Sequence, residues 1–331
     1  MTIAEVRRPV GDKLVTVFGG SGFIGRHVVR ALARDGWRVR VAVRRPDLAG
    51  HLQPLGGVGQ IVAVQANVRF PESVAQAVQG ADAVVNLVGI LSESGKQSFD
   101  AVQARAPGVV AAAARAAGVA RFVQMSAIGA DRASRGLYGR SKAAGEEAVL
   151  AVYPDAVILR PSVVFGPEDQ FFNRFAAMAR MSPALPLVGG GRTLFQPVFV
   201  GDVAEVVARA VSGAVPGGPQ AYELGGPETL SFKDILRYVL KTTCRRRLLA
   251  PLPFGLARMA GRVLQILPNA PLTADQVAML ETGNVVSQEA RAAGRTLEGL
   301  GIVPTPFDAV APSYLWRFRR AGQFERARQE G

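Results

Sequence analysis

Three side chains near the middle of the sequence could together move a proton to or from a carbonyl group. Tyr138 and Lys142 are four residues apart, so in a helix they project from the same face. A tyrosine hydroxyl has a pKa of about 10, and a neighbouring ammonium lowers it by favouring the phenolate. Ser126, which follows a short apolar run, could orient the carbonyl oxygen. We predict Ser126, Tyr138 and Lys142 as a catalytic set; the alternative is a helix-start tyrosine beside a solvated lysine.

A glycine-rich turn near the N-terminus could bind phosphate. Gly19-Gly-Ser-Gly-Phe-Ile-Gly25 has the spacing G-x-x-G-x-x-G, follows an apolar run at Leu14–Phe18 and precedes a helical pattern. Glycines at these places let the backbone turn sharply, approach a pyrophosphate and pack the helix on the strand. The N–H groups at the helix N-terminus would face the phosphates. Dinucleotide binding is the prediction, and a turn needed only for packing is the alternative.

The residues after the second expected strand indicate which dinucleotide is bound. About 20 residues beyond the turn, an NAD site usually offers a carboxylate to the ribose 2′-hydroxyl. Here the strand ends in Val43-Arg44-Arg45, and the first carboxylate is Asp47. An arginine at Arg44 suits a 2′-phosphate, which predicts NADP(H). The alternative is a solvated charge pair in a basic protein.

Strands and helices alternate along the first part of the chain, as needed to bring these residues to one edge of a sheet. Short apolar runs predict buried parallel strands, and segments of helical periodicity predict helices between them. The expected strands are 14–18, 38–43, 61–64, 83–88, 121–125, 156–159 and 197–200, and the expected helices are 24–34, 72–79, 99–117, 137–152 and 202–211. The fold class is therefore α/β, a Rossmann-type doubly wound parallel sheet with a smaller, mostly helical C-terminal region.

The predicted organisation has three parts. A basic tail occupies residues 1–12, an NAD(P)-binding Rossmann domain occupies 13–230, and a small basic helical region occupies 231–331. Segments belonging to the C-terminal region are expected to be inserted in the Rossmann domain from about residue 165.

Composition narrows the classes of function. The 331 residues are 49% hydrophobic and 20% charged, which is typical of a globular protein. Lys and Arg outnumber Asp and Glu by 39 to 26, a net charge of +13 that favours an anionic partner. A single cysteine excludes a disulfide framework, and with two histidines it leaves too few soft ligands for a structural zinc site. No apolar run approaches the roughly 20 residues that span a bilayer.

Several motifs together make the sequence similar to the extended or atypical short-chain dehydrogenases/reductases. They are Gly19–Gly25, Asn86-Leu87-Val88-Gly89, Ser126, Tyr138-x-x-x-Lys142 and Arg160-Pro161-Ser162. More narrowly, the second half resembles the NADPH-binding accessory subunits of respiratory complex I (NADH:ubiquinone oxidoreductase) and their bacterial relatives. The stretches that carry this narrower resemblance are 165–175, 195–203, 222–227, 251–254 and 271–276.

The resemblance implies bound NADPH and an accessory or assembly role beside the peripheral-arm subunits of complex I, with little turnover. The nucleotide contacts that it implies are Gly19, Ser21, Gly22, Phe23, Ile24, Gly25, Arg44, Asn67, Val68, Val88, Gly89, Tyr138, Lys142, Pro161, Ser162, Val163 and Val164. Two residues depart from the family pattern. Gln103 replaces an asparagine that supports a proton relay to the lysine, and Asn67 replaces an aspartate beside the adenine. An active NADP(H)-dependent reductase, epimerase or dehydratase is the alternative function.

The basic C-terminal region predicts a docking surface. Arg245-Arg246-Arg247 precedes a predicted helix at Phe254–Leu267 that is apolar on most of its circumference. Such a helix packs against its own domain, or the segment Arg245–Leu267 docks on a partner or an anionic membrane surface. The aromatic and cationic run Tyr314–Arg320 suits the same surface. We expect a cytoplasmic protein, peripheral at the cytoplasmic face of the inner membrane, with no nucleic-acid partner.

Overall fold

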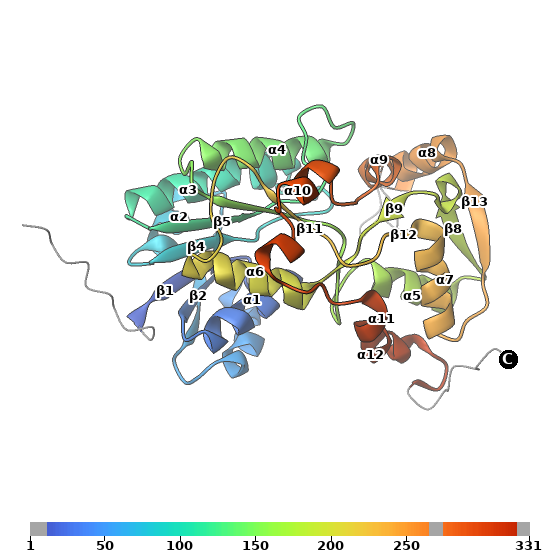
Figure 1. Ribbon diagram of the computed structural model, residues 1–331, viewed down its shortest axis with the longest axis horizontal. Helices are drawn as coiled ribbons and strands as arrows, with labels where there is room; N and C mark the ends of the chain where they lie inside the picture. The colour runs from blue at the N-terminus through green and yellow to red at the C-terminus, as the bar shows by residue number, and fades with distance from the viewer. Residues whose placement is uncertain (1–11, 265–273, 323–331) are drawn as a thin grey trace, which may run out of the picture. The chain divides into compact units, whose positions relative to one another are not determined.

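The computed structural model describes residues 12–264 and 274–322, and the chain forms two compact units (Figure 1). Unit 1 consists of Met1–Ser126, Ser141–Leu159 and Val203–Tyr222, and unit 2 of Ala127–Arg140, Arg160–Asp202 and Glu223–Gly331. The units are thus discontinuous in the sequence, whereas the predicted regions 1–12, 13–230 and 231–331 are contiguous and stay predictions.

The main sheet has seven strands in the order β11-β6-β5-β4-β1-β2-β3. The strands are β1 (Leu14–Phe18), β2 (Arg38–Val43), β3 (Ile61–Gln65), β4 (Ala83–Asn86), β5 (Arg121–Met125), β6 (Val157–Pro161) and β11 (Tyr222–Leu224). All neighbouring pairs from β3 to β6 are parallel, and β1 pairs with both β2 and β4. The strand order therefore reverses between β1 and β4, where open α/β sheets form a crevice at their carboxyl ends.

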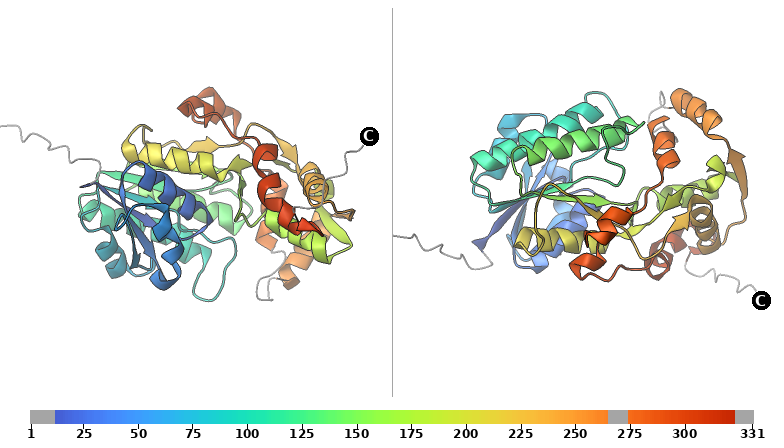
Figure 2. Two further views of the ribbon diagram at one scale, coloured as in Figure 1. Left: turned by 90° about the horizontal axis from the view of Figure 1, so that it is seen from below. Right: turned by 45° about the horizontal axis from the view of Figure 1, so that its top comes forward.

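Helices cover both faces of this sheet (Figure 2). They are α1 (Phe23–Arg34) and α6 (Val200–Ser212) on one face, and α2 (Pro71–Val78), α3 (Ala106–Ala116) and α4 (Leu137–Leu150) on the other. Between sheet and helices lies an apolar core that includes Phe18, Val84, Phe122 and Ile158. A sheet covered twice needs strands that are apolar throughout, which is why the short apolar runs of the sequence identified six of the seven strands. Strand β11 was not expected, and the expected strand 197–200 corresponds to Val198–Phe199, which pairs outside this sheet. The predicted Rossmann-type, doubly wound class is confirmed.

Among the element boundaries that differ from the prediction, two have a clear local cause. The expected helix 99–117 begins with a wider π-helical segment, η4 (Asp100–Arg105), before α3. Pro107 in the first turn of α3 has no N–H to continue a regular ladder. Strand β4 ends at Asn86, whose side chain binds a backbone group that would otherwise continue the ladder. Asn86 Oδ1 accepts from the Val88 N–H at 3.2 Å, while Nδ2 donates to Gln124 Oε1 at 2.9 Å.

Unit 2 consists of short elements around an aromatic core. Its strand pairs are β7 (Val164–Phe165) with β10 (Val198–Phe199), β8 (Ala184–Val188) with β13 (Leu248–Leu252), and β9 (Leu194–Phe195) with β12 (Leu230–Ser231). Its helices are α5 (Phe172–Met181), α7 (Phe232–Thr242), α8 (Phe254–Leu264), α9 (Ala274–Thr282), α10 (Gln288–Ala292), α11 (Phe307–Val310) and α12 (Pro312–Leu315). Phe307 lies at the centre, with ring centroids 5.0 Å from Phe165 and 4.4 Å from Phe172.

The C-terminal region departs from the expected docking surface in one place. Tyr314 and Leu315 are buried in the unit 2 core, so the prediction that the whole run Tyr314–Arg320 lies on a surface is wrong. Helix α8 begins at Phe254 as predicted, and residues 265–267 of the predicted helix lie outside the described residues. Within residues 12–264 and 274–322, no helix combines the length and apolar character that crossing a membrane requires.

Candidate nucleotide and proton-transfer site

The predicted nucleotide residues of unit 1 follow the carboxyl ends of neighbouring strands. The glycine turn follows β1, Arg44 follows β2, Asn67 and Val68 follow β3, Val88 and Gly89 follow β4, and Ser126 follows β5. Because parallel strands end at one edge of the sheet, these residues line the same edge. The other predicted contacts, Tyr138 and Pro161–Val164, belong to unit 2, apart from Lys142 in unit 1.

The turn between β1 and α1 requires glycine at defined places. Gly19 has a φ of 77°, and its carbonyl accepts from the Gly22 N–H at 3.1 Å. A Cβ on Gly25 would lie 2.6 Å from the Gly20 Cα, so any side chain there would displace the turn. Helix α1 has no side-chain cap and no acidic residue in its first turn. Its first N–H groups therefore remain for an anion, as a pyrophosphate needs.

Arg44 and Arg45 have different surroundings. Arg45 forms an ion pair with Asp47 at 2.7 Å, which is the solvated pair of the alternative interpretation. Arg44 is exposed and donates from Nη1 to the Gln97 Oε1 at 2.7 Å. Its partner among the described residues is thus a neutral amide, which a phosphate can displace.

Asn67 and Val68 contribute to local structure. The Asn67 side-chain oxygen accepts from the Arg69 N–H at 3.2 Å, and its own N–H donates to Ser73 Oγ at 3.0 Å. The Val68 side chain is buried in the unit 1 core. Asn67 therefore fixes the turn after β3, and its Nδ2 could donate to the edge of an adenine.

Ser126 and Lys142 are buried polar groups of unit 1. Ser126 is 4% exposed, its N–H donates to the Leu159 carbonyl at 2.7 Å, and its Oγ has no hydrogen-bond partner among the described residues. Lys142 is 7% exposed, and its Nζ donates to the Met125 carbonyl at 3.4 Å. Burial lowers the pKa of Lys142 to about 8, against the opposing effect of the Glu146 carboxylate.

The side chain of Gln103, the residue that departs from the family pattern, lies beside Gly89, as does that of Lys142. It lies in η4, is 2% exposed and donates from Nε2 to Ser141 Oγ at 3.4 Å, while its Oε1 has no partner within the described residues. A Cβ on Gly89 would lie 3.3 Å from Lys142 Nζ and 3.5 Å from Gln103 Oε1. Gly89, Gln103 and Lys142 therefore surround one small space.

Two unsatisfied buried oxygens at one edge of a sheet indicate a site built for a polar ligand. An unpaired buried donor or acceptor costs about 1–3 kcal/mol, and such groups are few in a folded protein. Ser126 Oγ and Gln103 Oε1 are two of them. The hydroxyl groups of a bound nucleotide or the oxygen of a carbonyl compound would supply partners, so the residues present fit a dinucleotide.

Tyr138 lies in the first turn of α4 and is held by a residue from another helix. The Leu137 and Tyr138 N–H groups donate to the two carboxylate oxygens of Asp275, at 2.6 and 3.1 Å. Burial, and then the Asp275 charge, raise the pKa of Tyr138 to about 12. The expectation that Lys142 lowers this pKa is wrong, because burial dominates at both groups and shifts each toward its neutral form.

The other predicted contacts of unit 2 are Pro161–Val164. Ser162 donates from its N–H to the Leu224 carbonyl at 2.8 Å and from its hydroxyl to Asn284 Oδ1 at 2.7 Å. The Pro161 carbonyl accepts from the Ile128 N–H at 3.1 Å. Asn284 and Asp275, which hold two of the predicted residues, are not among the predicted site residues because they are more than 100 residues away in the sequence.

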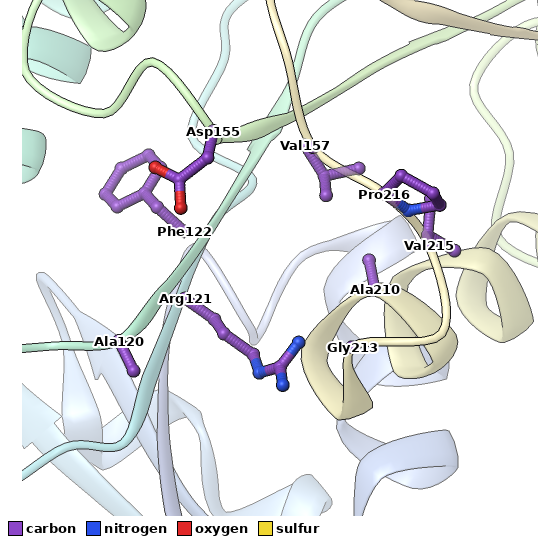
Figure 3. Close-up of a pocket in the computed structure, with 10 residues that line it drawn as sticks. Ala120, Arg121, Phe122, Asp155, Val157, Ala210, Gly213, Val215 and Pro216 are labelled. Atoms are coloured by element: carbon purple, nitrogen blue, oxygen red, sulfur yellow. The ribbon is translucent and has the colours of Figure 1, made fainter.

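A pocket of about 350 Å³ lies elsewhere in unit 1 (Figure 3). It is lined by the first residues of β5 and β6 and the end of α6, with Arg121 and Asp155 as its charged groups. None of the predicted site residues lines it, and it lies where these strands begin rather than where they end. It is therefore separate from the nucleotide site.

Comparisons with known proteins agree with this fold. Residues 15–225 match the model of the NAD dependent epimerase/dehydratase family. The rat mitochondrial protein "NADH dehydrogenase (ubiquinone) 1 alpha subcomplex subunit 9" is 35% identical over 317 residues, 95% of this chain and 82% of that protein. A ceramide reductase of Caulobacter vibrioides is 37% identical over 175 residues, 53% of this chain and 54% of that protein. The structure of the NADPH-dependent quinone oxidoreductase QOR2 from Escherichia coli with NADPH matches with a TM-score of 0.70 at 20% identity. The match covers 91% of this chain and 99% of that chain and shows a shared fold.

Proposed function

We propose, from the premise that this chain belongs to the NAD dependent epimerase/dehydratase family, that it is an NADPH-binding accessory subunit or assembly and stability factor of respiratory complex I. The observation that carries the proposal is its 35% identity, over 95% of its length, to a protein named as a subunit of NADH dehydrogenase (ubiquinone). Its direct partners are then the peripheral-arm subunits of that complex.

The nucleotide in the proposal is NADPH. The glycine turn and the uncapped start of α1 would hold its pyrophosphate, and Arg44 would bind its 2′-phosphate in exchange for Gln97. The remaining proposed contacts are those that the resemblance implies: Asn67, Val68, Val88, Gly89, Tyr138, Lys142 and Pro161–Val164. A bound NADPH would supply hydride.

Little turnover is expected from the protonation states of the reactive groups. An acid is most effective when its pKa lies near the working pH. Tyr138, with a pKa of about 12, is a weak proton donor and is almost never a phenolate at neutral pH. Lys142, with a pKa of about 8, is mostly charged at neutral pH, yet the pKa of Tyr138 is raised rather than lowered. Gln103 also replaces the relay asparagine of the active relatives.

A second candidate is an active NADP(H)-dependent reductase of the same superfamily. Ser126, Tyr138 and Lys142 are all present, and the 37% identity to a ceramide reductase favours this alternative over half of the chain. Carbonyl reduction that requires Tyr138 would establish it.

We propose a cytoplasmic location, peripheral at the cytoplasmic face of the inner membrane. On α8, Leu256 is 56% and Met259 is 64% exposed, although Ala257 between them is buried in unit 2. Arg262 is an exposed cation of the same helix, and Arg246 is an exposed cation that precedes β13. We name these four residues the α8 surface. It suits an anionic lipid layer, into which apolar side chains insert while arginines contact headgroups.

The other arginines of the expected tether have partners in unit 2. Arg245 Nε donates to the Phe318 carbonyl at 3.0 Å, and Arg247 Nε donates to the Ala179 carbonyl at 2.8 Å. Arg258 lies 3.5 Å from a carboxylate oxygen of Glu281. The proposed tether therefore depends on Arg246 and Arg262 rather than on all five arginines.

Complementation of a deletion strain tests the function. Membranes from cells that lack the protein should lose NADH:quinone activity, and Tyr138→Phe should restore it because no turnover is needed. Gly22→Asp, which places an anion in the phosphate-binding turn, should fail to restore it. If Tyr138→Phe accumulates as folded protein and fails as completely as Gly22→Asp, the reductase is the correct function.

A further inference from the structure

The start of the helix that carries Tyr138 is capped from a distant part of unit 2. Helix N-termini are usually capped by a side chain immediately before the first turn. Before α4 that position is Gly136, and the cap is instead the carboxylate of Asp275, which accepts from the N–H groups of Leu137 and Tyr138. These partners are 138 and 137 residues apart in the sequence. The cap therefore joins the first turn of α4 to α9.

Gly136 allows this close approach. A Cβ at that position would lie 3.1 Å from Asp275 Oδ1, closer than ordinary van der Waals contact. The glycine is buried, and the carboxylate lies directly against it. A larger residue would push the carboxylate away from the two N–H groups.

The segment Ala274–Asn284 contacts the residues before α4 at two further points. Glu281, at the end of α9, lies 3.5 Å from the Arg135 guanidinium. Asn284 donates from Nδ2 to the Ile128 carbonyl at 3.4 Å and accepts from the Ser162 hydroxyl. One short segment thus holds the chain on both sides of the turn that leads to Tyr138.

We propose that Asp275 is a positioning residue for Tyr138: its carboxylate fixes the first turn of α4 and adds a negative charge to the surroundings of the Tyr138 side chain. The C-terminal region thereby controls the reactive side chain of the predicted catalytic set. The inference goes beyond the proposed function, since it holds equally for an accessory subunit and for an active reductase.

The charges around Tyr138 support this assignment. Arg135 and Arg140 flank it in the chain, Lys142 follows one turn later on α4, and α9 contributes Asp275 and Glu281. Arg140 donates from Nη1 to the Ser134 and Arg135 carbonyls, and Glu281 lies beside Arg135. Asp275 is the charge that raises the pKa of Tyr138, and it acts in the same direction as burial.

Two substitutions separate the charge of Asp275 from its hydrogen bonds. Asp275→Asn removes the charge but keeps one side-chain oxygen, whereas Asp275→Ala removes the charge and both acceptors. Asp234→Asn is the matched control, because Asp234 occupies the first turn of α7, a different helix of unit 2. Tyr138→Phe identifies the signal of Tyr138 in full-length protein labelled with ¹³Cζ-tyrosine.

The experiment measures the ¹³Cζ titration of Tyr138 and the amide hydrogen exchange of Leu137 and Tyr138. Both Asp275 variants should lower the titration midpoint of Tyr138, by on the order of half to one pH unit. Asp275→Ala should also speed exchange by about 2- to 30-fold, the range that loss of a cap produces. Asp275→Asn should speed it less, and Asp234→Asn should change neither quantity.

Two outcomes would overturn the proposal. One is an unchanged Tyr138 titration in folded Asp275→Asn, which would show that the carboxylate does not influence the hydroxyl. The other is unchanged exchange at both amides in Asp275→Ala. If Asp275→Ala does not fold, Asp275→Asn supplies both measurements, because its side chain has nearly the same size.

Discussion

Replacing Arg44 tests the assignment of the nucleotide as NADPH. In the structure, Arg44 makes one hydrogen bond to a neutral amide, Gln97. A 2′-phosphate would replace that bond by a bidentate, charge-assisted pair. The net gain is then about one hydrogen bond to a charged group, roughly 1.5–3 kcal/mol, or about 10- to 150-fold in affinity. We therefore expect NADPH to bind tighter than NADH by that factor, with the lower half favoured because Arg44 is exposed.

Titration calorimetry with both nucleotides measures this preference in the parent and in three variants. Arg44→Ala should remove most of the preference and leave NADH binding nearly unchanged. Gln97→Ala removes the competing amide, so the preference should rise by about 2- to 10-fold, the value of an ordinary hydrogen bond. Arg45→Ala is the control, because Arg45 is already paired with Asp47.

The two nucleotides provide an internal check on folding, since NADH affinity reports an intact site. Equal dissociation constants for NADPH and NADH in the parent protein would refute the argument. A preference that survives in Arg44→Ala would place the 2′-phosphate elsewhere.

Three further predictions follow from single contacts. Gly25→Ala should lower the free energy of unfolding by about 1–3 kcal/mol and abolish nucleotide binding, because its Cβ would overlap the backbone of the turn. Urea titrations measure this loss. Gly50→Ala is the control and should match the parent, because its Cβ would meet no atom within 4 Å. Between pH 8 and 10.5 the unfolded chain retains the proton that Lys142 has lost in the folded protein, so the free energy of unfolding should rise with pH by on the order of 3 kcal/mol. Lys142→Met should flatten that rise. The same rise in Lys142→Met as in the parent would contradict the pKa of about 8. The double variant Arg246→Gln/Arg262→Gln should bind anionic vesicles about 30-fold more weakly at low salt, because each arginine contributes about 1 kcal/mol. Equal sedimentation of the parent and the double variant with vesicles would exclude the α8 surface as the tether.

Features that depend on short stretches of sequence were predictable. The glycine turn, the apolar strands and Arg44 each have a local physical cause. In the structure, the glycine turn follows the end of β1 and Arg44 follows the end of β2. The π-helical turn at Asp100–Arg105 was not predicted, although Pro107 is a local signal that could have indicated it. The order of strands then brings these segments to one edge.

Features that depend on tertiary contacts were not predictable. Asp275 and Asn284 reach Tyr138 and Ser162 across more than 100 residues. Asp275 lies in the stretch 271–276 that carries the narrower resemblance, but nothing in that stretch indicates that it reaches Tyr138. The direction in which the pKa of Tyr138 is shifted depends on burial, which residue spacing alone does not reveal. Tyr314 was assigned to a surface because its neighbours are charged, yet it packs in the unit 2 core.

Affinity purification from solubilised membranes tests the central proposal most directly. The chain carrying an affinity tag would be expressed at its natural level, extracted in mild detergent and analysed by quantitative mass spectrometry, beside tagged Gly22→Asp. We predict that the peripheral-arm subunits of the respiratory NADH:ubiquinone oxidoreductase co-purify with the parent in comparable molar amounts, and that Gly22→Asp recovers far less. Recovery of the parent protein without any respiratory subunit would contradict the account.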